Sequence, residues 1–341
     1  MTANRLSAVV EKTRAQATIG ALRAEGVYDD DRPVYECGGD AVAIPVTHPP
    51  EQTAVREVVV DEGPADPPTL ATLLADRGWT EAELDSVPAS WAVIGRVILV
   101  RVEDCPRPDE VGKALLDLHG GADTVLARTG IDGPHREPTV RVLAGEGDTE
   151  TVHREHGTEY ALDIATVMFS PGNKSERTLM GERVEDGERV LDMFAGIGYF
   201  TLPMARGGAS VTAVERNPAS FQYLVENVLR NGVQDRVETY RADCRDVTAG
   251  VAAGDDRPFD RIVMGHYDAH EYLDSALAVL APGGTLHLHT ATPERLLPER
   301  PTSRLDRAVG EADRQITDID VRNVKGYSEG VVHAVVDAVI E

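Results

Sequence analysis

A glycine-containing loop after a buried apolar run is the first segment of the chain that could do chemistry. Residues 190–198 read Val-Leu-Asp-Met-Phe-Ala-Gly-Ile-Gly. Gly196 and Gly198 lack a Cβ atom, so they allow the backbone to approach a ligand closely. The loop is not the G-x-G-x-x-G motif of dinucleotide-binding proteins, because Thr201 replaces the third glycine and Asp192 would repel a pyrophosphate. Asp192 can instead contact a cationic ligand; the alternative is an ordinary tight turn between a strand and a helix.

Two further acidic residues follow the next apolar runs at informative spacings. Glu215 stands 23 residues after Asp192, where a carboxylate can bind a ribose diol. A helix cap or a surface charge is the alternative role for Glu215. Asp243 follows the third run, where an adenine amino group is usually held, and Cys244 offers a backbone N–H to the purine edge. A cationic group, a ribose and an adenine together predict S-adenosylmethionine (AdoMet) as the ligand.

The remaining reactive side chains give less information. His266 follows the fourth apolar run and is a candidate catalytic residue, with a structural role as the alternative. We expect the Cys244 thiol to pack passively, because no feature of the sequence favours a lowered thiol pKa. The three cysteines, Cys37, Cys105 and Cys244, are far apart in the sequence, which predicts neither a disulfide framework nor a metal site.

Alternating patterns of helix and buried strand position these residues. The strand-like runs are residues 189–193, 210–215, 237–242, 261–264 and 284–290. Such alternation predicts a doubly wound parallel sheet, in which ligands bind at the carboxyl ends of the strands. We therefore expect residues 169–341 to form an α/β, Rossmann-like domain of the class I AdoMet-dependent methyltransferase type, closed by a C-terminal hairpin.

Two small α+β domains are expected before this sheet. The first covers residues 1–60 and opens with a helix over residues 5–25. Residues 61–68 are rich in Pro and Gly and predict a linker. The second covers residues 70–168, and its residues 91–102 predict one long strand.

The composition is strongly acidic. The chain of 341 residues has 58 Asp and Glu against 34 Lys and Arg, which gives a formal net charge of −24. Such a charge would ordinarily repel nucleic acid. The alternative is adaptation to a cytoplasm rich in salt, as in a halophilic archaeon, because the Debye length falls to about 3 Å at 1 M salt. No apolar run approaches the roughly 18–20 residues of a membrane span, so we expect a cytoplasmic protein.

In the order of these motifs, the chain resembles the wybutosine-synthesis enzyme 2 family, the tRNA 3-amino-3-carboxypropyl transferases. It is similar, more distantly, to the tRNA guanine-N1 methyltransferases of the same architecture. Residues 169–172 read Phe-Ser-Pro-Gly where the methyltransferases have Phe-Ser-Pro-Arg. Residues 264–266 read Met-Gly-His where the methyltransferases have Asn-Leu-Pro, and Glu215 stands where Asp is commoner among them. All three departures favour the aminocarboxypropyl branch.

The resemblance implies a reaction and a set of contacts. AdoMet would donate its 3-amino-3-carboxypropyl group to the base 4-demethylwyosine beside the anticodon of tRNA(Phe), and methylthioadenosine would be released. The family's AdoMet contacts correspond to Ser170, Arg177, Glu215, Asp243 and Cys244. Arg177 would anchor the methionine carboxylate; a surface ion pair with a neighbouring Glu is the alternative.

The resemblance also implies tRNA as the partner, held in part by the domain over residues 70–168, and we expect a monomer. Unstacked bases beside the anticodon can stack on aromatic side chains, for which Tyr199, Phe200 and Tyr267 are candidates. Arg128 and Arg136 are candidates for tRNA contact, with a solvated surface as the alternative. Two other functions stay open: a tRNA guanine-N1 methyltransferase, and a non-catalytic module that binds tRNA or AdoMet.

Overall fold

The computed structural model of the protein describes residues 5–30, 32–60, 68–133, 137–254 and 258–341. These residues group into two compact units, Met1–Gly78 and Trp79–Glu341, each of which is described by itself. The predicted linker over residues 61–68 lies outside the described residues, apart from Pro68. The division of the chain into domains 1–60, 70–168 and 169–341 stays a prediction.

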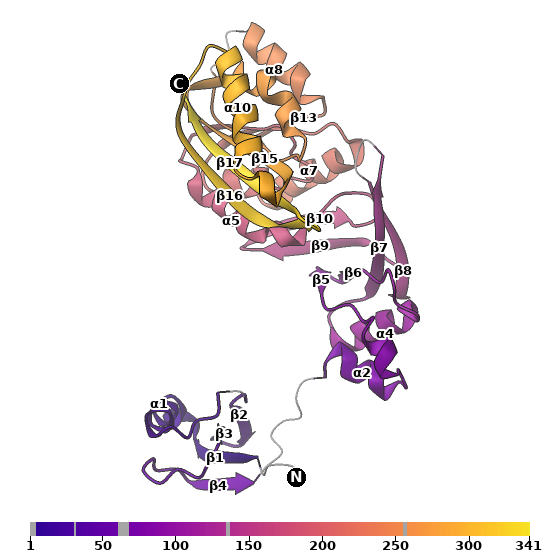
Figure 1. Ribbon diagram of the computed structural model, residues 1–341, viewed down its shortest axis with the longest axis vertical. Coiled ribbons are helices and arrows are strands. Elements are labelled where there is room, and N and C mark those ends of the chain that lie inside the picture. Colours follow the sequence, from indigo (N-terminus) through magenta and orange to yellow (C-terminus); the bar gives the residue numbers. More distant parts are fainter. Residues whose placement is uncertain (1–4, 31, 61–67, 134–136, 255–257) are drawn as a thin grey trace. The chain divides into compact units, whose positions relative to one another are not determined.

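The first unit contains a four-stranded antiparallel sheet in the order β2-β3-β1-β4 (Figure 1). Its elements are β1 (Leu6–Glu11), α1 (Ala15–Glu25), β2 (Tyr35–Gly38), β3 (Ala41–Val46), β4 (Glu57–Val60) and α2 (Leu70–Asp76). The prediction of one helix over residues 5–25 is wrong in its first half. Residues 6–11 form a strand because Ala8 and Val10 are buried in the core between sheet and helix, and only the segment from Ala15 is helical.

The second unit begins with a mixed sheet in the order β5-β6-β7-β8, followed by the hairpin β9–β10. Its elements are α3 (Glu81–Leu84), β5 (Trp91–Ile94), β6 (Val97–Val100), α4 (Pro108–Leu118), β7 (Thr124–Asp132), β8 (Glu137–Gly145), β9 (Glu150–Glu155) and β10 (Thr158–Asp163). The prediction of one strand over residues 91–102 is wrong. The chain reverses at Gly95, which has φ +56 and leaves no room for a Cβ atom against Thr151 and Val152.

A seven-stranded sheet forms the rest of the unit, in the order β13-β12-β11-β14-β15-β17-β16. Its strands are β11 (Arg189–Asp192), β12 (Ser210–Val214), β13 (Val237–Tyr240), β14 (Phe259–Met264), β15 (Leu280–Pro293), β16 (Ile316–Ser328) and β17 (Val331–Ile340). The first five are parallel, and the β16–β17 hairpin is antiparallel to β15. The predicted doubly wound sheet with a closing hairpin is confirmed.

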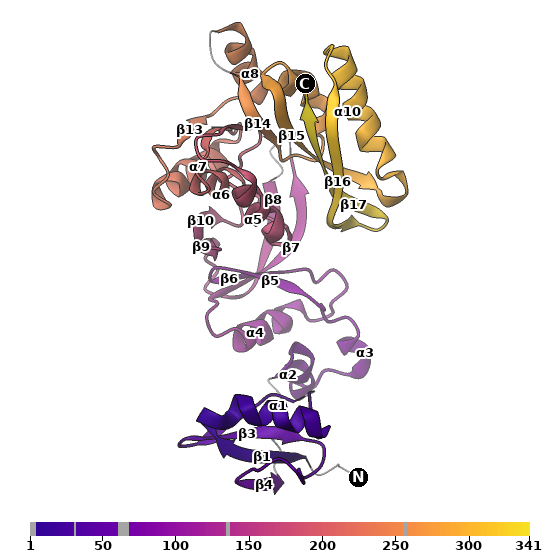
Figure 2. The same cartoon turned by 90° about the vertical axis from the view of Figure 1, so that its left-hand side faces the viewer.

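Helices cover both faces of this sheet (Figure 2). The helices of one face are α5 (Lys174–Arg183), α6 (Thr201–Arg206) and α7 (Pro218–Arg230). Those of the other face are α8 (Cys244–Ala253), α9 (Leu273–Leu277) and α10 (Glu299–Glu311). The core under α5, α6 and α7 continues into Ile94, Val97 and Leu126 of the preceding sheet, so the two sheets share one core. Among the described residues, no helix is long and apolar enough to cross a membrane.

Candidate active site

A pocket runs along the edge of the sheet at which the parallel strands end. In the order of the strands, its lining residues include Asp243 and Cys244 after β13, Glu215 after β12, Gly196 after β11, Gly265, His266 and Tyr267 after β14, His289 in β15 and His333 in β17. The connections reverse direction between β11 and β14, and such a switch point is where doubly wound sheets bind ligands. We refer to the two sides of this point as the β11–β13 half and the β14–β17 half of the pocket.

The two glycines of the loop after β11 have different tasks. Gly196 has φ +56, and a Cβ atom added there would meet no atom within 4 Å, so its position is open toward the pocket. Gly198 has φ +96 and does not line the pocket. A Cβ atom at Gly198 would lie 2.9 Å from Cγ of Leu202, so this glycine allows α6 to pack closely.

Asp192 is turned away from the pocket. Its carboxylate is fully buried, where it accepts a hydrogen bond of 2.8 Å from the Thr201 hydroxyl and one of 3.4 Å from the backbone N–H of Phe194. Burial raises the pKa of Asp192 to about 6. Asp192 is not a lining residue, so its carboxylate shapes the loop, and its expected contact with a cationic ligand, directly or through water, stays a prediction.

Glu215 faces the pocket and is held by the backbone. Its two carboxylate oxygens accept hydrogen bonds of 2.8 Å from the N–H of Gly196 and 2.6 Å from the N–H of Asn217. Burial raises its pKa, although these bonds oppose the effect. Each oxygen keeps a lone pair for a further donor, so Glu215 can accept hydrogen bonds from a diol.

Asp243 and Cys244 form the outer end of the β11–β13 half. Asp243 caps α8 by accepting a hydrogen bond of 3.0 Å from the N–H of Arg245, and it forms an ion pair of 2.7 Å with the Arg245 guanidinium. These contacts lower the pKa of Asp243. Burial and the neighbouring charge of Asp243 raise the pKa of the Cys244 thiol to about 12, so the thiol stays protonated. A passive role for this thiol, as expected, agrees with its raised pKa.

Ser170 lines the pocket, but Arg177 lies behind it. The Arg177 side chain is 2% exposed and forms a two-pronged ion pair with Glu155, at 2.6 and 2.7 Å. Its remaining Nη donates a hydrogen bond of 3.0 Å to the carbonyl of Ser170. The Arg177 guanidinium also lies over the ring of Tyr199, at 4.3 Å from the centroid. The structure thus places Arg177 in a buried ion pair, neither on the surface nor in the pocket.

Lys325 supplies a positive charge beside the pocket that sequence reasoning missed. Its ammonium group donates a hydrogen bond of 2.6 Å to the Ser170 hydroxyl. Burial and the charges of Arg177 and Arg128 lower the pKa of Lys325 to about 8. The signal that could have indicated Lys325 is the scarcity of lysine, since the chain has four lysines in all.

The aromatic candidates and His266 gather around the switch point. Phe200 is buried, and the Tyr199 hydroxyl donates to the Ser170 carbonyl at 2.6 Å. His266 lines the pocket with its ring 5.3 Å from that of Phe194. Its Nδ1 accepts a hydrogen bond of 3.2 Å from the N–H of Asp268, so a neutral His266 carries its proton on Nε2. His266 can therefore donate a hydrogen bond from Nε2, whereas its lone pair, on Nδ1, is already engaged with the N–H of Asp268.

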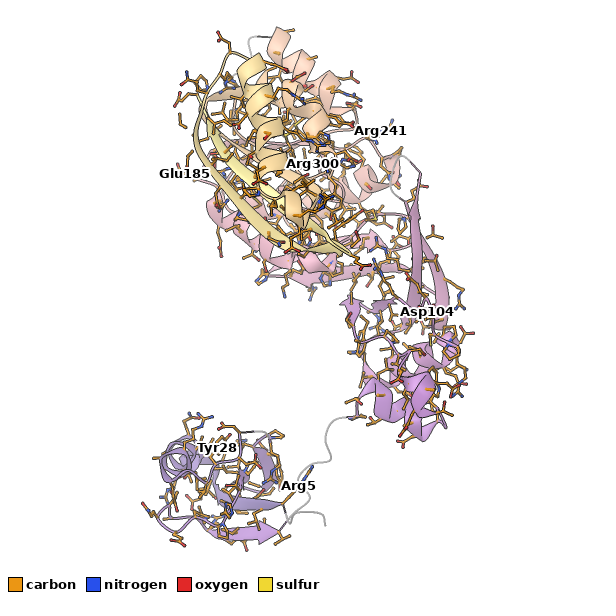
Figure 3. The ribbon with its side chains drawn as sticks, viewed as in Figure 1. Arg5, Tyr28, Asp104, Glu185, Arg241 and Arg300 are labelled. Carbon is orange, nitrogen blue, oxygen red and sulfur yellow. The ribbon has the colours of Figure 1, made fainter. Side chains whose placement is uncertain are left out.

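A cluster of arginines marks α10 and the short helix η4 (Glu294–Leu296) before it. It consists of Arg295, Arg300, Arg304 and Arg307, which we call the α10 arginine cluster; Figure 3 labels Arg300. Within the described residues, none of the four forms an ion pair with a carboxylate. Burial and the charges of Arg300 and Arg307 lower the pKa of Arg304. Of the two candidate arginines for tRNA contact, Arg128 lies near Met168, which lines the pocket, and Arg136 falls outside the described residues.

Of the AdoMet-binding and catalytic residues proposed from the sequence, the structure brings six together around the pocket, and the three stacking candidates line it as well: Ser170, Gly196, Glu215, Asp243, Cys244 and His266, with Tyr199, Phe200 and Tyr267. It places Arg177, Asp192 and Gly198 behind the lining. His289 and His333 were missed because they lie in strands predicted only as structural. Over the described residues, no group of three His, Cys, Asp or Glu side chains is placed to hold a metal ion.

Residues 151–317 match the family model described as the TRM5/TYW2 methyltransferase domain, and residues 70–149 match the model described as the TYW2 N-terminal domain. The chain belongs to the TRM5/TYW2 family. The predicted resemblance is thereby confirmed. The chain is 38% identical, over 74% of its length and 89% of the relative's, to the tRNA(Phe) (4-demethylwyosine(37)-C(7)) aminocarboxypropyltransferase of Pyrococcus horikoshii.

Solved structures agree with this placement of the TRM5/TYW2 protein. TYW2 from P. horikoshii in complex with MeSAdo superimposes with a TM-score of 0.66 at 32% identity, covering 79% of this chain and 97% of that one. Wild-type Trm5b from Pyrococcus abyssi superimposes with a TM-score of 0.76 at 26% identity, covering 98% of this chain and 99% of that one.

Proposed function

We propose that this TRM5/TYW2 protein transfers the 3-amino-3-carboxypropyl group of AdoMet to C7 of 4-demethylwyosine at position 37 of tRNA(Phe), and releases methylthioadenosine. The observation that carries the proposal is one undivided pocket across the switch point, in a chain 38% identical over 74% of its length to an enzyme named for that reaction. A two-substrate transfer needs room for both reactants at one edge of the sheet, and the two halves of the pocket offer it.

The β11–β13 half fits the adenosine part of AdoMet. Glu215 has an accepting lone pair on each oxygen for the ribose diol, and Gly196 leaves space for the ribose because no atom lies where its Cβ would be. Asp243 can accept from the adenine amino group, and Cys244, whose backbone N–H we assign to the purine edge, lines the same end of the pocket. Asp192 and Gly198 contribute by fixing the loop that carries Gly196.

The amino-acid end of AdoMet is assigned to Ser170 and Lys325. A carboxylate beside the Ser170 hydroxyl would gain a charge-assisted hydrogen bond to the Lys325 ammonium, 2.6 Å from that hydroxyl. Arg177 does not contact the ligand itself but holds Ser170 in place, because its guanidinium and the Tyr199 hydroxyl both donate hydrogen bonds to the Ser170 carbonyl. We therefore replace the expected contact between Arg177 and the carboxylate by a positioning role.

Catalysis by these residues is mainly the positioning of two reactants. The carbon nucleophile and the γ-carbon of the donor must approach in line, and holding them so converts an encounter into an intramolecular reaction. The choice of the carbon that is transferred depends on where Ser170 and Lys325 hold the amino-acid end. Glu215 and Asp243 bind the shared adenosine part and do not discriminate between the possible reactions. His266 contributes by donating a hydrogen bond to the acceptor base.

The α10 arginine cluster is the surface that we assign to the tRNA backbone. Arg300, Arg304 and Arg307 follow each other at spacings of four and three residues, so they share one face of the helix. Helix α10 contacts β15, β17 and the short helix η3 (Ala269–Tyr272), which directly follows the pocket residues of the β14–β17 half. Within the part of the chain that the structure describes, these four arginines form no ion pair with a carboxylate, although the net charge of the chain is −24. Such a cluster of cations fits the phosphates of a polyanion.

A tRNA guanine-N1 methyltransferase at position 37 is the second candidate. It is favoured by the superposition on Trm5b, which extends over 98% of this chain. That likeness concerns the fold, whereas the higher identity to the aminocarboxypropyltransferase concerns the sequence over both matched domains.

The deciding experiment uses two tRNA substrates in parallel, one that carries the tricyclic base and one that is unmodified, with AdoMet labelled either in the carboxyl or in the methyl carbon. Carboxyl label in the tRNA, with methylthioadenosine released, is the expected result. Methyl label in unmodified tRNA, with S-adenosylhomocysteine released, would establish the methyltransferase instead. Binding of AdoMet without any label transfer would establish a non-catalytic module.

We further propose a monomer that works in a salt-rich cytoplasm and needs no metal. The acidic composition with four lysines supports the salt adaptation of the protein. Unfolding on dilution into low salt, followed by tryptophan fluorescence, would support the salt adaptation. A protein that stays folded there would contradict it. Sedimentation in high salt tests the monomer, and transfer activity in a chelator tests the independence from metal.

A further inference from the structure

Two buried histidines contact each other and line the β14–β17 half of the pocket. His289 of β15 is 2% exposed and His333 of β17 is 1% exposed, and both are lining residues. Nδ1 of His289 and Nε2 of His333 are 3.0 Å apart, which makes a hydrogen bond between the two rings. The proposed function gives neither ring a role.

The outer nitrogens of this pair have no partner. Nε2 of His289 and Nδ1 of His333 are both buried, and neither has a hydrogen bond with any described residue. Two neutral imidazoles carry one proton each, and one of these protons lies in the bond between the rings. One outer nitrogen must therefore carry an N–H and the other must carry a free lone pair, whichever of the two histidines donates the hydrogen bond between the rings.

His287 shows what a structural histidine looks like on the same strand. It stands two residues before His289 and is also buried. Its Nδ1 is 2.6 Å from a carboxylate oxygen of Asp337, and its Nε2 is 2.7 Å from the guanidinium of Arg261. Buried polar atoms in native proteins normally have such partners, so the two open nitrogens beside a pocket point to a ligand that completes them.

The surroundings keep the pair neutral. Burial, followed by the charges of Lys325 and Arg322 from β16, lowers the pKa of His333 to about 4. Burial and the neighbouring His333 and His287 lower the pKa of His289, against the opposing charge of Asp337 of β17. The lone pair is thus available at neutral pH, without prior loss of a proton.

The walls around the pair suit a flat heteroaromatic ring. The Phe200 ring lies 5.1 Å from that of His289, and the Tyr267 ring lies 5.0 Å from that of His333. Both aromatic residues line the pocket. The subsite therefore offers aromatic surface together with one donor and one acceptor, which matches a nucleobase.

We propose that the His289–His333 pair accepts the ring proton that the acceptor base loses in the transfer. This inference rests on the proposed function. The acceptor carbon uses a π electron pair to bond to the γ-carbon, and the carbon–sulfur bond breaks with both electrons passing to sulfur. The base is left positively charged, with the new substituent and a hydrogen on one carbon. The free lone pair on the outer nitrogen of the two histidines takes that proton, and the acceptor base regains its aromaticity. The positive charge is then shared across the hydrogen bond between the two imidazoles.

The test compares the full-length wild type with His289→Gln, His333→Gln and His287→Gln. Single-turnover transfer is measured with tRNA carrying either hydrogen or deuterium on the acceptor carbon. AdoMet and tRNA affinities and the unfolding midpoint are measured alongside. We expect transfer by His289→Gln and His333→Gln to fall about 10²–10⁴-fold and to gain a primary deuterium isotope effect that the wild type lacks. His287→Gln should lower the unfolding midpoint without an isotope effect.

The outcomes separate this inference from the proposed function. If the wild type transfers no carboxyl label, the proposed function fails, and the inference fails with it. If the wild type is active but His289→Gln and His333→Gln show no isotope effect, the pair does not accept the proton and the inference alone is overturned. An equal isotope effect in His287→Gln would also overturn it, because the effect would then follow from damage to the strand.

Discussion

Replacing Glu155 by Gln tests whether Arg177 acts through a buried ion pair. The side chains of Arg177 and Glu155 are 2% and 6% exposed. In Glu155→Gln the guanidinium keeps its charge but loses the carboxylate that neutralises it. Removing one partner of a buried pair typically destabilises a protein by about 3–5 kcal/mol, so we expect a large loss of unfolding free energy.

The pKa of Glu155 gives a second estimate of the unfolding free energy that the ion pair contributes. Burial by itself would raise this pKa, but hydrogen bonds from His153 and Arg177 outweigh burial and lower it from 4.5 to about 2. At about 1.4 kcal/mol per pKa unit, the lowered pKa corresponds to roughly 3 kcal/mol. Because the folded-state pKa is the lower one, this stabilisation is present above pH 4.5 and is lost as the pH falls toward 2.

Denaturant unfolding followed by tryptophan fluorescence measures the effect. The chain has two tryptophans, Trp79 and Trp91, and both belong to the second unit, so the signal reports on the unit that contains the pair. Asp109→Asn is the matched control, since it breaks an exposed pair with Arg141 and should cost less than about 1 kcal/mol. An unfolding free energy for Glu155→Gln equal to that of the control would refute the buried-pair reasoning. Loss of AdoMet affinity without loss of stability would return Arg177 to the role of carboxylate anchor.

Three further predictions concern the two substrates. Glu215→Gln should weaken AdoMet binding about 10- to 100-fold in calorimetry, because hydrogen bonds to a charged group contribute about 1.5–3 kcal/mol; unchanged affinity would exclude Glu215 from the ribose site. Lys325→Met should weaken AdoMet binding, and wild-type affinity should decline as the pH rises through about 8, where Lys325 loses its proton; a pH-independent affinity would contradict the assignment. Replacing Arg300 and Arg304 together by Gln should reduce the salt dependence of tRNA binding by about two phosphate contacts, with AdoMet affinity unchanged; an unaltered slope would place the tRNA elsewhere.

The sheet and its ligand edge could be predicted because their signals are local. Continuous apolar runs alternating with amphipathic segments indicate buried parallel strands and their helices, and the residues that follow each run must lie at one edge. Glu215, Asp243 and Gly196 were found in this way, and the structure brings them to one pocket. The two wrong elements depend on distant residues: residues 6–11 are a strand because they pair with β3 and β4, and residues 91–102 reverse at Gly95, which packs against Thr151 and Val152.

Burial and pairing could not be predicted, because both depend on residues far apart in the sequence. Arg177 sits 22 residues after the Glu155 that pairs with it, and nothing in either segment shows that the pair lies behind the pocket. Asp192 precedes the glycines, as in a ligand-binding loop, yet its carboxylate turns to Thr201 on the next helix.

The sequence by itself determined the fold class, the glycine loop and the acidic residues at the strand ends, because each follows from the order of residues along one βα unit. Only the tertiary structure decided which of them face the ligand. It also decided that Lys325, His289 and His333 join the site, because the C-terminal hairpin folds back beside β15 and brings distant strands to the same edge. Residue types and spacing set which groups are available, and long-range packing sets which of them meet.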